Sequence, residues 1–467
     1  MFEDITGIIY ENKNKEVVIG AIPELLLFTE SIILPDTVKV IETDAFKKVR
    51  VPQTTLTIPS SCEIIKQNAF KRAAFKDIII KEGLKKIESY AFHSTTADSI
   101  VLPTTLKVIP ECAFNDAKIR NINLENVISI GRLAFYKSFI NSATLSEDLI
   151  ALGELAFEDC RNLKEVSYNS SILIPGGAFK NCVNLEKFEI NAKPKRIGIA
   201  AFNNCGKLKE INLPDSLKII GATAFQNSGL EKILIPSHVA AIGEYAFHNC
   251  IDLKEIIIED SKRKEGLILG KYCFCHTAVR DLVIPHSVND MDEGIVSFTE
   301  SLESLTVLAN VEKIPYDFAH GCSSLKSLEL TPNIKLISDE AFADTGFTEL
   351  TNSLENVELI AEQSFKNCRK LEKVLFSPKC EKLYLSSNIF ENCNNLKEIF
   401  VLGNLTGNED TFCNINDNVK IYISGNFEFV GLPNRKNFIF DKEVIKETLV
   451  EAFPFRKASK LVEILER

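Results

Sequence analysis

The chain has 467 residues, of which 45% are hydrophobic and 25% are charged, and its formal net charge is −10 at pH 7. This composition is typical of a globular protein, and an acidic chain without a basic stripe argues against binding to nucleic acid or to an anionic membrane surface. Trp is absent whereas Phe occurs 31 times, which suggests that one structural position uses Phe repeatedly.

The first residues predict a cap. Residues 1–20 lack the basic and apolar regions of a secretory signal, and no stretch of the chain approaches the 18 apolar residues of a membrane-spanning helix. Residues 7–21, GIIYENKNKEVVIGA, read as two apolar strands joined by a polar turn. We therefore expect residues 1–28 to form an N-terminal hairpin cap.

A short repeat occupies most of the remaining chain. Its units align on a Phe that usually follows Ala, at positions 46, 70, 92, 114, 135, 157, 179, 202, 225, 247, 274, 298, 318, 342, 365, 390 and 412. The spacings cluster at 22 to 24 residues, and the units at Phe298, Phe318 and Phe412 depart from the pattern. A unit this short cannot bury its own apolar face, so the copies must stack on one another.

Each unit has two halves. In residues 208–229, Ile211 and Leu213 lie two apart and share one face of a strand, which Pro214 ends. The second half is expected to be a turn and a short helical or irregular segment. Its inward residues are Ile220, Ala224 and Phe225.

The stacked units predict an α/β repeat fold, a solenoid with about 17 short parallel strands over residues 29–428. Units such as IPSHVAAIGEYAFHNCIDLKEIII resemble the BspA-type leucine-rich repeats of bacterial and protist surface proteins. The resemblance extends over residues 20 to 425, although the chain lacks the Asn ladder that follows LxL in commoner leucine-rich repeats.

The resemblance implies a non-catalytic protein-binding solenoid of the surface-antigen or adhesin type, acting in cell adhesion. Its partner would be a host or extracellular-matrix protein, and it would lie at the cell surface or be secreted. The alternative is an intracellular scaffold or adaptor built on the same array, which the lack of a signal peptide and the unpaired thiols favour. The sequence leaves both locations, extracellular and cytoplasmic, open.

The cysteines read as core residues. Six of the thirteen lie three residues after the repeated Phe: Cys160, Cys182, Cys205, Cys250, Cys368 and Cys393. Other units hold Ala73, Thr95 or Ser138 at this position. A position that accepts Cys, Ala, Thr and Ser selects small size, and buried Cys behaves as a small hydrophobe.

No motif predicts catalysis or a bound cofactor. The chain has no Walker loop, GxSxG, HExxH or GxGxxG sequence. The cluster CFCH contains Cys273, Cys275 and His276, but no second pair follows at zinc-finger spacing, so we expect no metal site. His248, directly after Phe247, is expected at the surface, and Cys250 in the core.

Candidate protein-binding residues come from the strands. The residue between the two inward ones should point outward, and in this row Leu234, Ile257 and Val283 form an apolar run over three consecutive units. Leu375 and Phe400 continue the row later in the chain. Exposed apolar patches mark interaction sites. The alternatives are that a tail covers these residues, that a neighbouring molecule covers them, or that they are merely tolerated.

Two further segments leave alternatives open. The longest unit carries Lys262, Arg263 and Lys264, in a loop that is either solvated or a docking loop. Residues 429–467 predict a C-terminal helical cap or tail. Within them, residues 441–453 have a helical apolar pattern, with Asp441 placed as N-cap. The sequence does not decide between a cap and a partner-docking tail.

Overall fold

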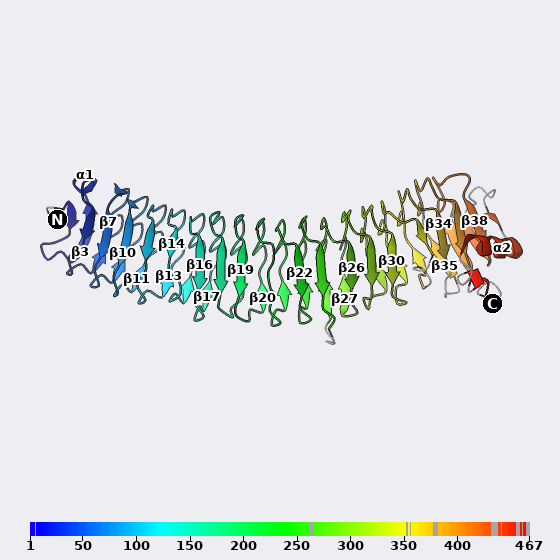
Figure 1. Cartoon of the computed structure of the whole chain (residues 1–467), viewed down its shortest axis with the longest axis horizontal. Helices are drawn as coiled ribbons and strands as arrows, with labels where there is room; N and C mark the ends of the chain where they lie inside the picture. The colour runs from blue at the N-terminus through cyan, green and yellow to red at the C-terminus, as the bar shows by residue number, and fades with distance from the viewer. Residues whose placement is uncertain are drawn as a thin grey trace. The chain divides into compact units, whose positions relative to one another are not determined.

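A computed structural model describes the chain except residues 5, 262–265, 352–353, 355, 377–381, 431–437, 440, 454–457, 460 and 464–467. The described chain divides into two compact units, residues 1–239 and 240–467. Each unit is a solenoid of successive coils, as the sequence predicts (Figure 1). The predicted loop at Lys262, Arg263 and Lys264 lies outside the described residues.

Most coils contribute one strand to a first row of parallel strands. In residues 1–239 the row contains β4 (Ser31–Ile33), β7 (Thr55–Ile58), β10 (Asp77–Ile80), β12 (Ser99–Val101), β14 (Asn121–Ile122), β16 (Ser142–Leu145), β18 (Glu165–Tyr168), β19 (Lys187–Ile190) and β22 (Lys232–Ile235). In residues 240–467 it contains β24 (Glu255–Ile258), β26 (Asp281–Ile284), β28 (Ser304–Val307), β30 (Ser327–Leu330), β32 (Glu349–Leu350), β34 (Lys373–Phe376), β36 (Glu398–Val401), β38 (Lys420–Ile423) and β40 (Phe438–Ile439). The predicted parallel strands are confirmed, with one exception. Residues 208–214 form no strand, so the strand expected at Ile211 and Leu213 is wrong, although Ile211 is buried as predicted.

A second row of parallel strands was not predicted. In residues 1–239 it contains β3 (Val17–Ala21), β5 (Val40–Ile41), β8 (Ile64–Ile65), β11 (Lys86–Ile87), β13 (Val108–Ile109), β15 (Ser129–Ile130), β17 (Ala151–Leu152), β20 (Arg196–Ile197) and β21 (Ile219–Ile220). In residues 240–467 it contains β23 (Ala241–Ile242), β25 (Leu267–Leu269), β27 (Val288–Met291), β29 (Lys313–Ile314), β31 (Leu336–Ile337), β33 (Leu359–Ile360), β35 (Lys382–Leu385), β37 (Asn404–Asn408) and β39 (Phe427–Val430).

The second half of each unit therefore begins as a strand and continues as turns, and the expectation of a helical or irregular segment is wrong for its first residues. Ile219 and Ile220 pair in register with Arg196 and Ile197 of the preceding coil. A strand ladder between coils satisfies the backbone hydrogen-bonding groups of both coils, and strands favour β-branched residues such as Ile. A single helical turn provides neither.

The described ends differ from the coils. At the N-terminus, β1 (Phe2–Glu3), β2 (Ile8–Tyr10) and β3 pair antiparallel. A short helix α1 (Pro23–Leu26) and a small sheet of β6 (Arg50–Val51) and β9 (Ala74–Phe75) complete the first unit. At the C-terminus, helix α2 (Lys442–Ala452) begins at Asp441, whose carboxylate accepts hydrogen bonds from the amides of Glu443 and Val444. The predicted N-cap is confirmed.

The repeated Phe forms a continuous stack of rings in the first unit, and we call its place in each coil the ring position. From Phe46 to Phe225, consecutive centroids lie 4.9 to 5.7 Å apart with planes within 10° of parallel. The rings are fully buried. The separation is close to the spacing of about 4.8 Å between neighbouring strands, so the coils set the distance at which rings stack.

In the second unit the ring position corrects the alignment. The amide of a ring residue donates to the carbonyl of the residue before the next ring, as Phe46 does to Ala69. By this bond Val296 and Ala319 occupy the ring position, because Phe274 donates to Ile295 and Ala319 donates to Ala341. Assigning the position to Phe298 and Phe318 was wrong. With Val296 and Ala319 the spacings from Phe274 to Phe342 become 22, 23 and 23 residues.

Left-handed backbone flanks every ring position from Phe46 to Phe390, two residues before it and two residues after it. Asn tolerates this conformation and often holds the later place, as at Asn181, Asn204 and Asn227, with φ of 59°, 61° and 57°. Their amides form a ladder, in which Asn204 donates to Asn181 at 2.8 Å and Asn227 donates to Asn204 at 2.9 Å. An asparagine ladder therefore exists, but at a different place from the one in commoner leucine-rich repeats.

The small residue three places after the ring joins neighbouring coils. The thiols of Cys160, Cys182 and Cys205 donate to carbonyls of the preceding coil, those of Phe135, Phe157 and Phe179, at 3.0, 3.1 and 3.3 Å. Thr95 makes the equivalent bond to Phe70 with its hydroxyl. The position thus favours a small side chain that can donate to the neighbouring coil, which is more than the small size predicted from the sequence.

The ring stack predicts a local response to truncation. We expect Phe135→Ala to lower the free energy of unfolding by about 3–5 kcal/mol, because the buried ring stacks on Phe114 and Phe157. Amide exchange should accelerate first in the two adjoining coils. The control is Phe139→Ala, an exposed ring in the same coil, with a change below about 1 kcal/mol. Equal loss of protection along residues 1–239 would contradict the local response.

The buried thiols should react slowly. Burial raises the pKa of Cys160 to about 12 and also raises the pKa of Cys182 and of Cys205. Since the thiolate is the nucleophile, we expect alkylation of these three at pH 8 to be at least about 100-fold slower than in denaturant. Peptide mass spectrometry measures each site, with the partly exposed Cys413 as internal comparison. Rapid labelling of any of the three in the native protein would contradict their assignment to the core.

Candidate binding surface

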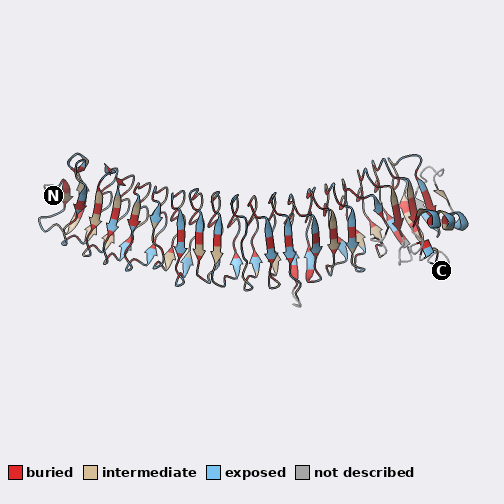
Figure 2. Cartoon of the chain, viewed as in Figure 1, coloured by how far each residue is buried: buried red, intermediate tan, exposed pale blue. Residues whose placement is uncertain are grey.

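The first row of strands presents alternate residues to the core and to solvent (Figure 2). In the second unit, Ile256 of β24 and Leu282 of β26 are buried, whereas Ile257 is 46% exposed and Val283 is 50% exposed. In the first unit, Leu234 of β22 is 48% exposed. The prediction that Leu234, Ile257 and Val283 point outward is thus confirmed.

A groove lies beside Ile257 and Val283 in the second unit. It encloses about 900 Å³ and is lined by Lys254, Glu255, Ile256, Ile257, Ile258, Ala278, Arg280, Asp281, Val283 and Ser301. Its two walls are β24 and β26, which belong to different hydrogen-bonded sheets, whereas β26 continues in register into β28. The unit between β24 and β26 is the longest in the chain.

Leu375 and Phe400 do not lie on an exposed surface, contrary to their place in the predicted apolar row. Both are buried in one cluster with Tyr422 and with residues of the C-terminal segment, namely Ile445, Leu449, Phe453, Ala458 and Leu461. The Phe400 ring stacks on Tyr422 at 4.7 Å and meets the Phe453 ring edge-on at 5.9 Å. The outward direction of the two side chains was predicted, but the chain's own helix covers them.

Helix α2 shows what this face of the sheet accepts. It places Ile445 and Leu449 against the strands and turns Val444 and Val450 to solvent. Figure 1 shows the helix beside β38. An amphipathic segment therefore covers the apolar row of β34, β36 and β38, whereas Ile257 and Val283 in the same row of the second unit remain open.

The residues of the CFCH cluster separate. Cys273 is fully buried, Cys275 is buried at the edge of the core, and His276 is exposed. His248 is half-buried rather than fully at the surface, and it lies beside Cys275 and His276. The sequence analysis looked for metal ligands only within one unit, so it did not predict that His248 lies beside Cys275 and His276 of the next unit. The signal was available, because His248 and Cys275 each directly follow a ring residue.

No helix in the described part of the chain has the length and apolar character needed to cross a membrane.

The coils, the ring position and the parallel strand rows define a leucine-rich repeat solenoid. The model of the BspA type leucine rich repeat region matches six copies, over residues 27–126, 85–175, 173–297, 263–372 and 295–420. The chain belongs to this family. No curated protein matches the sequence.

Solved structures with the same repeat include a leucine-rich repeat protein from Bacteroides ovatus, 21% identical, with a TM-score of 0.62 over 92% of this chain and 99% of that chain. A leucine-rich repeat protein from Eubacterium ventriosum is 18% identical, with a TM-score of 0.35 over 69% of this chain and 78% of that chain. The pneumococcal vaccine antigen PcpA is 16% identical, with a TM-score of 0.35 over 94% and 99%. The first likeness shows the fold.

Two adjacent isoleucines test the assignment of the two faces. We expect Ile256→Ser to lower the free energy of unfolding by about 2–4 kcal/mol, because it removes buried apolar volume and buries a hydroxyl. Ile257→Ser should change it by less than about 1 kcal/mol, since that side chain is half in solvent. Urea unfolding of the two variants gives the comparison. The reverse order would mean that the strand register is wrong by one residue.

Proposed function

We propose that the chain is a non-catalytic protein-binding solenoid whose partner contacts the first row of strands in the second unit. The observation that carries the proposal is the exposed pair Ile257 and Val283 beside the groove of about 900 Å³. Exposed apolar residues that lie together and are bordered by polar ones mark interaction sites. The groove is also lined by two basic and two acidic residues, Lys254, Arg280, Glu255 and Asp281.

The covered end of the same row supports a partner with an amphipathic segment. There the chain's own helix buries Leu375 and Phe400 and leaves a largely charged face to solvent, which also carries Val444 and Val450. A partner helix that places two or three apolar side chains on Ile257 and Val283 would use the same kind of contact. The mixed charges around the groove would then fix its orientation rather than supply most of the affinity.

The setting favoured by the family is the cell surface. On the resemblance to surface proteins with BspA-type repeats, the chain acts as a surface antigen or adhesin-type protein, and its partner is a host or extracellular-matrix protein. The second candidate is an intracellular scaffold or adaptor. Eleven of the twelve described cysteines are buried thiols, and thiols in such number are usual in a reducing compartment.

Binding can be tested with one double variant. We expect Ile257→Ser with Val283→Ser to weaken retention of the partner, identified by pull-down with the whole chain, by at least about tenfold, because hot spots are few and central. Ile268→Ser, which alters a similarly exposed residue of the second row, is the matched control. Equal retention by the wild type and the double variant, with unchanged stability, would contradict this surface.

The two settings are separated by labelling intact cells. Biotinylation of the chain by a reagent that does not cross membranes, with a cytoplasmic protein left unlabelled in the same sample, supports the surface antigen. Recovery of unlabelled chain in the soluble cell fraction supports the scaffold.

A further inference from the structure

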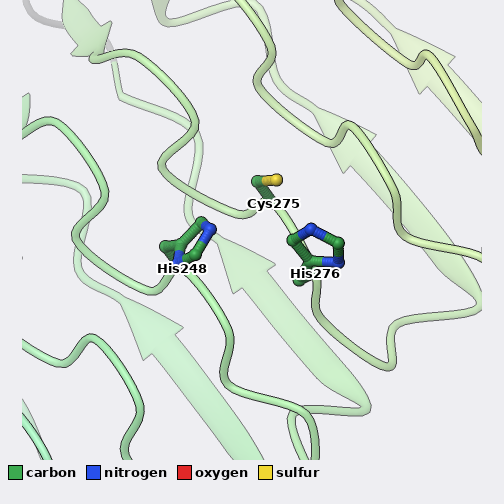
Figure 3. A group of neighbouring side chains, drawn as sticks. All are labelled: His248, Cys275 and His276. Carbon is green, nitrogen blue, oxygen red and sulfur yellow. The ribbon is translucent and has the colours of Figure 1, made fainter.

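Three side chains of types that bind metals, His248, Cys275 and His276, extend from two neighbouring turns of the second unit and lie close together (Figure 3). His248 directly follows the ring residue Phe247, and Cys275 and His276 follow the next ring residue, Phe274. A ligand atom from each of the three lies within 4.8 Å of the other two. Within the part of the chain that the structure describes, this is the one group of three or more His, Cys, Asp or Glu donors at that separation.

The two turns are held together on both sides of His248. The amide of Phe247 donates to the carbonyl of Cys273 at 2.8 Å, and the amide of Asn249 donates to the carbonyl of Cys275 at 3.0 Å. The register of the turns is therefore fixed by backbone bonds. His248 and Cys275 face each other across adjacent coils because both occupy the first place after the ring.

Aromatic neighbours orient the two imidazoles. The His248 ring meets the His276 ring edge-on at 5.5 Å and the Tyr245 ring edge-on at 5.3 Å. The His276 ring stacks on Phe298 at 5.2 Å. These contacts hold the three donors close to one another before an ion binds.

A negative charge lies close to the three donors. Asp317 lies nearby, where it accepts a hydrogen bond from Tyr272 at 3.0 Å, and its negative charge favours a cation.

We propose that His248, Cys275 and His276 form a binding site for Zn²⁺, with the fourth position open to water on the exposed side of His276. Two imidazoles and one thiolate are a donor set that zinc accepts, and three protein ligands leave one position free. On binding, the Cys275 S–H bond breaks, its proton passes to solvent, and the sulfur bonds to the metal. The ion would join the two turns.

The distances require a small closure. In a tetrahedral zinc site with bonds of about 2.0–2.3 Å, neighbouring donors lie roughly 3.3–3.8 Å apart. The present separations of up to 4.8 Å can close by rotation of the two imidazoles, one of which is exposed and the other half-buried.

The array itself supplies conservative variants. Asn203 occupies the place of His248 in another coil, Ser297 the place of Cys275, and Asn249 the place of His276. His248→Asn, Cys275→Ser and His276→Asn therefore introduce residues that the repeat already accommodates. The matched control is His93→Asn, because His93 also directly follows a ring residue.

The test uses the whole chain, reduced and freed of metal, and measures Co²⁺ spectra and competition by Zn²⁺. We expect one equivalent of Co²⁺ with a thiolate charge-transfer band and tetrahedral d–d absorption, displaced by Zn²⁺. Cys275→Ser should abolish the charge-transfer band, and each histidine variant should weaken Zn²⁺ binding by at least about tenfold. His93→Asn should bind as the wild type does.

Thermal unfolding gives a second readout, because an ion that binds only the folded chain raises its Tm. Zn²⁺ should raise the Tm of the wild type and of His93→Asn, and it should have a smaller effect on the other three variants. Zn²⁺ binding and a Tm shift that are the same in all variants, or the absence of a charge-transfer band in the wild type, would overturn the proposal.

Discussion

The distance between neighbouring coils constrains nearly every residue of this protein. Strand pairing fixes it at about 4.8 Å, and a side chain at a given place in one coil then lies on the side chain at the same place in the next. A buried place therefore favours residues that pack well on copies of themselves at that distance. Phe does so face to face, and consecutive rings of the first unit lie 4.9 to 5.7 Å apart.

The same constraint explains the polar places. Asn amides are donors and acceptors at once, so they can form a ladder such as Asn181, Asn204 and Asn227 without leaving a group unsatisfied. A thiol or hydroxyl after the ring satisfies a carbonyl of the preceding coil. Where successive coils place His248 against Cys275, the constraint brings two different donors together, and a function can arise from two ordinary positions of the repeat.

Much of this was predictable because the repeat samples each place many times. The ring position, the inward and outward faces and the buried Cys follow from comparing units. Phe298 and Phe318 were wrongly assigned to the ring position because the units were aligned on Phe. An alignment on even spacing would have chosen Val296 and Ala319 instead. The second strand row was missed because a two-residue strand has too little periodicity to be read. The burial of Leu375 and Phe400 depends on a helix more than 40 residues later, which no local pattern contains.

Coupling between rings tests the dependence on stacking most directly. A double-mutant cycle of Phe114→Ala and Phe135→Ala compares adjacent rings, and a cycle of Phe92→Ala and Phe157→Ala compares rings with two others between them. Stacking of neighbouring coils predicts a coupling free energy of about 0.5–1.5 kcal/mol for the first pair and about zero for the second. Equal coupling in both pairs, or none in either, would contradict it.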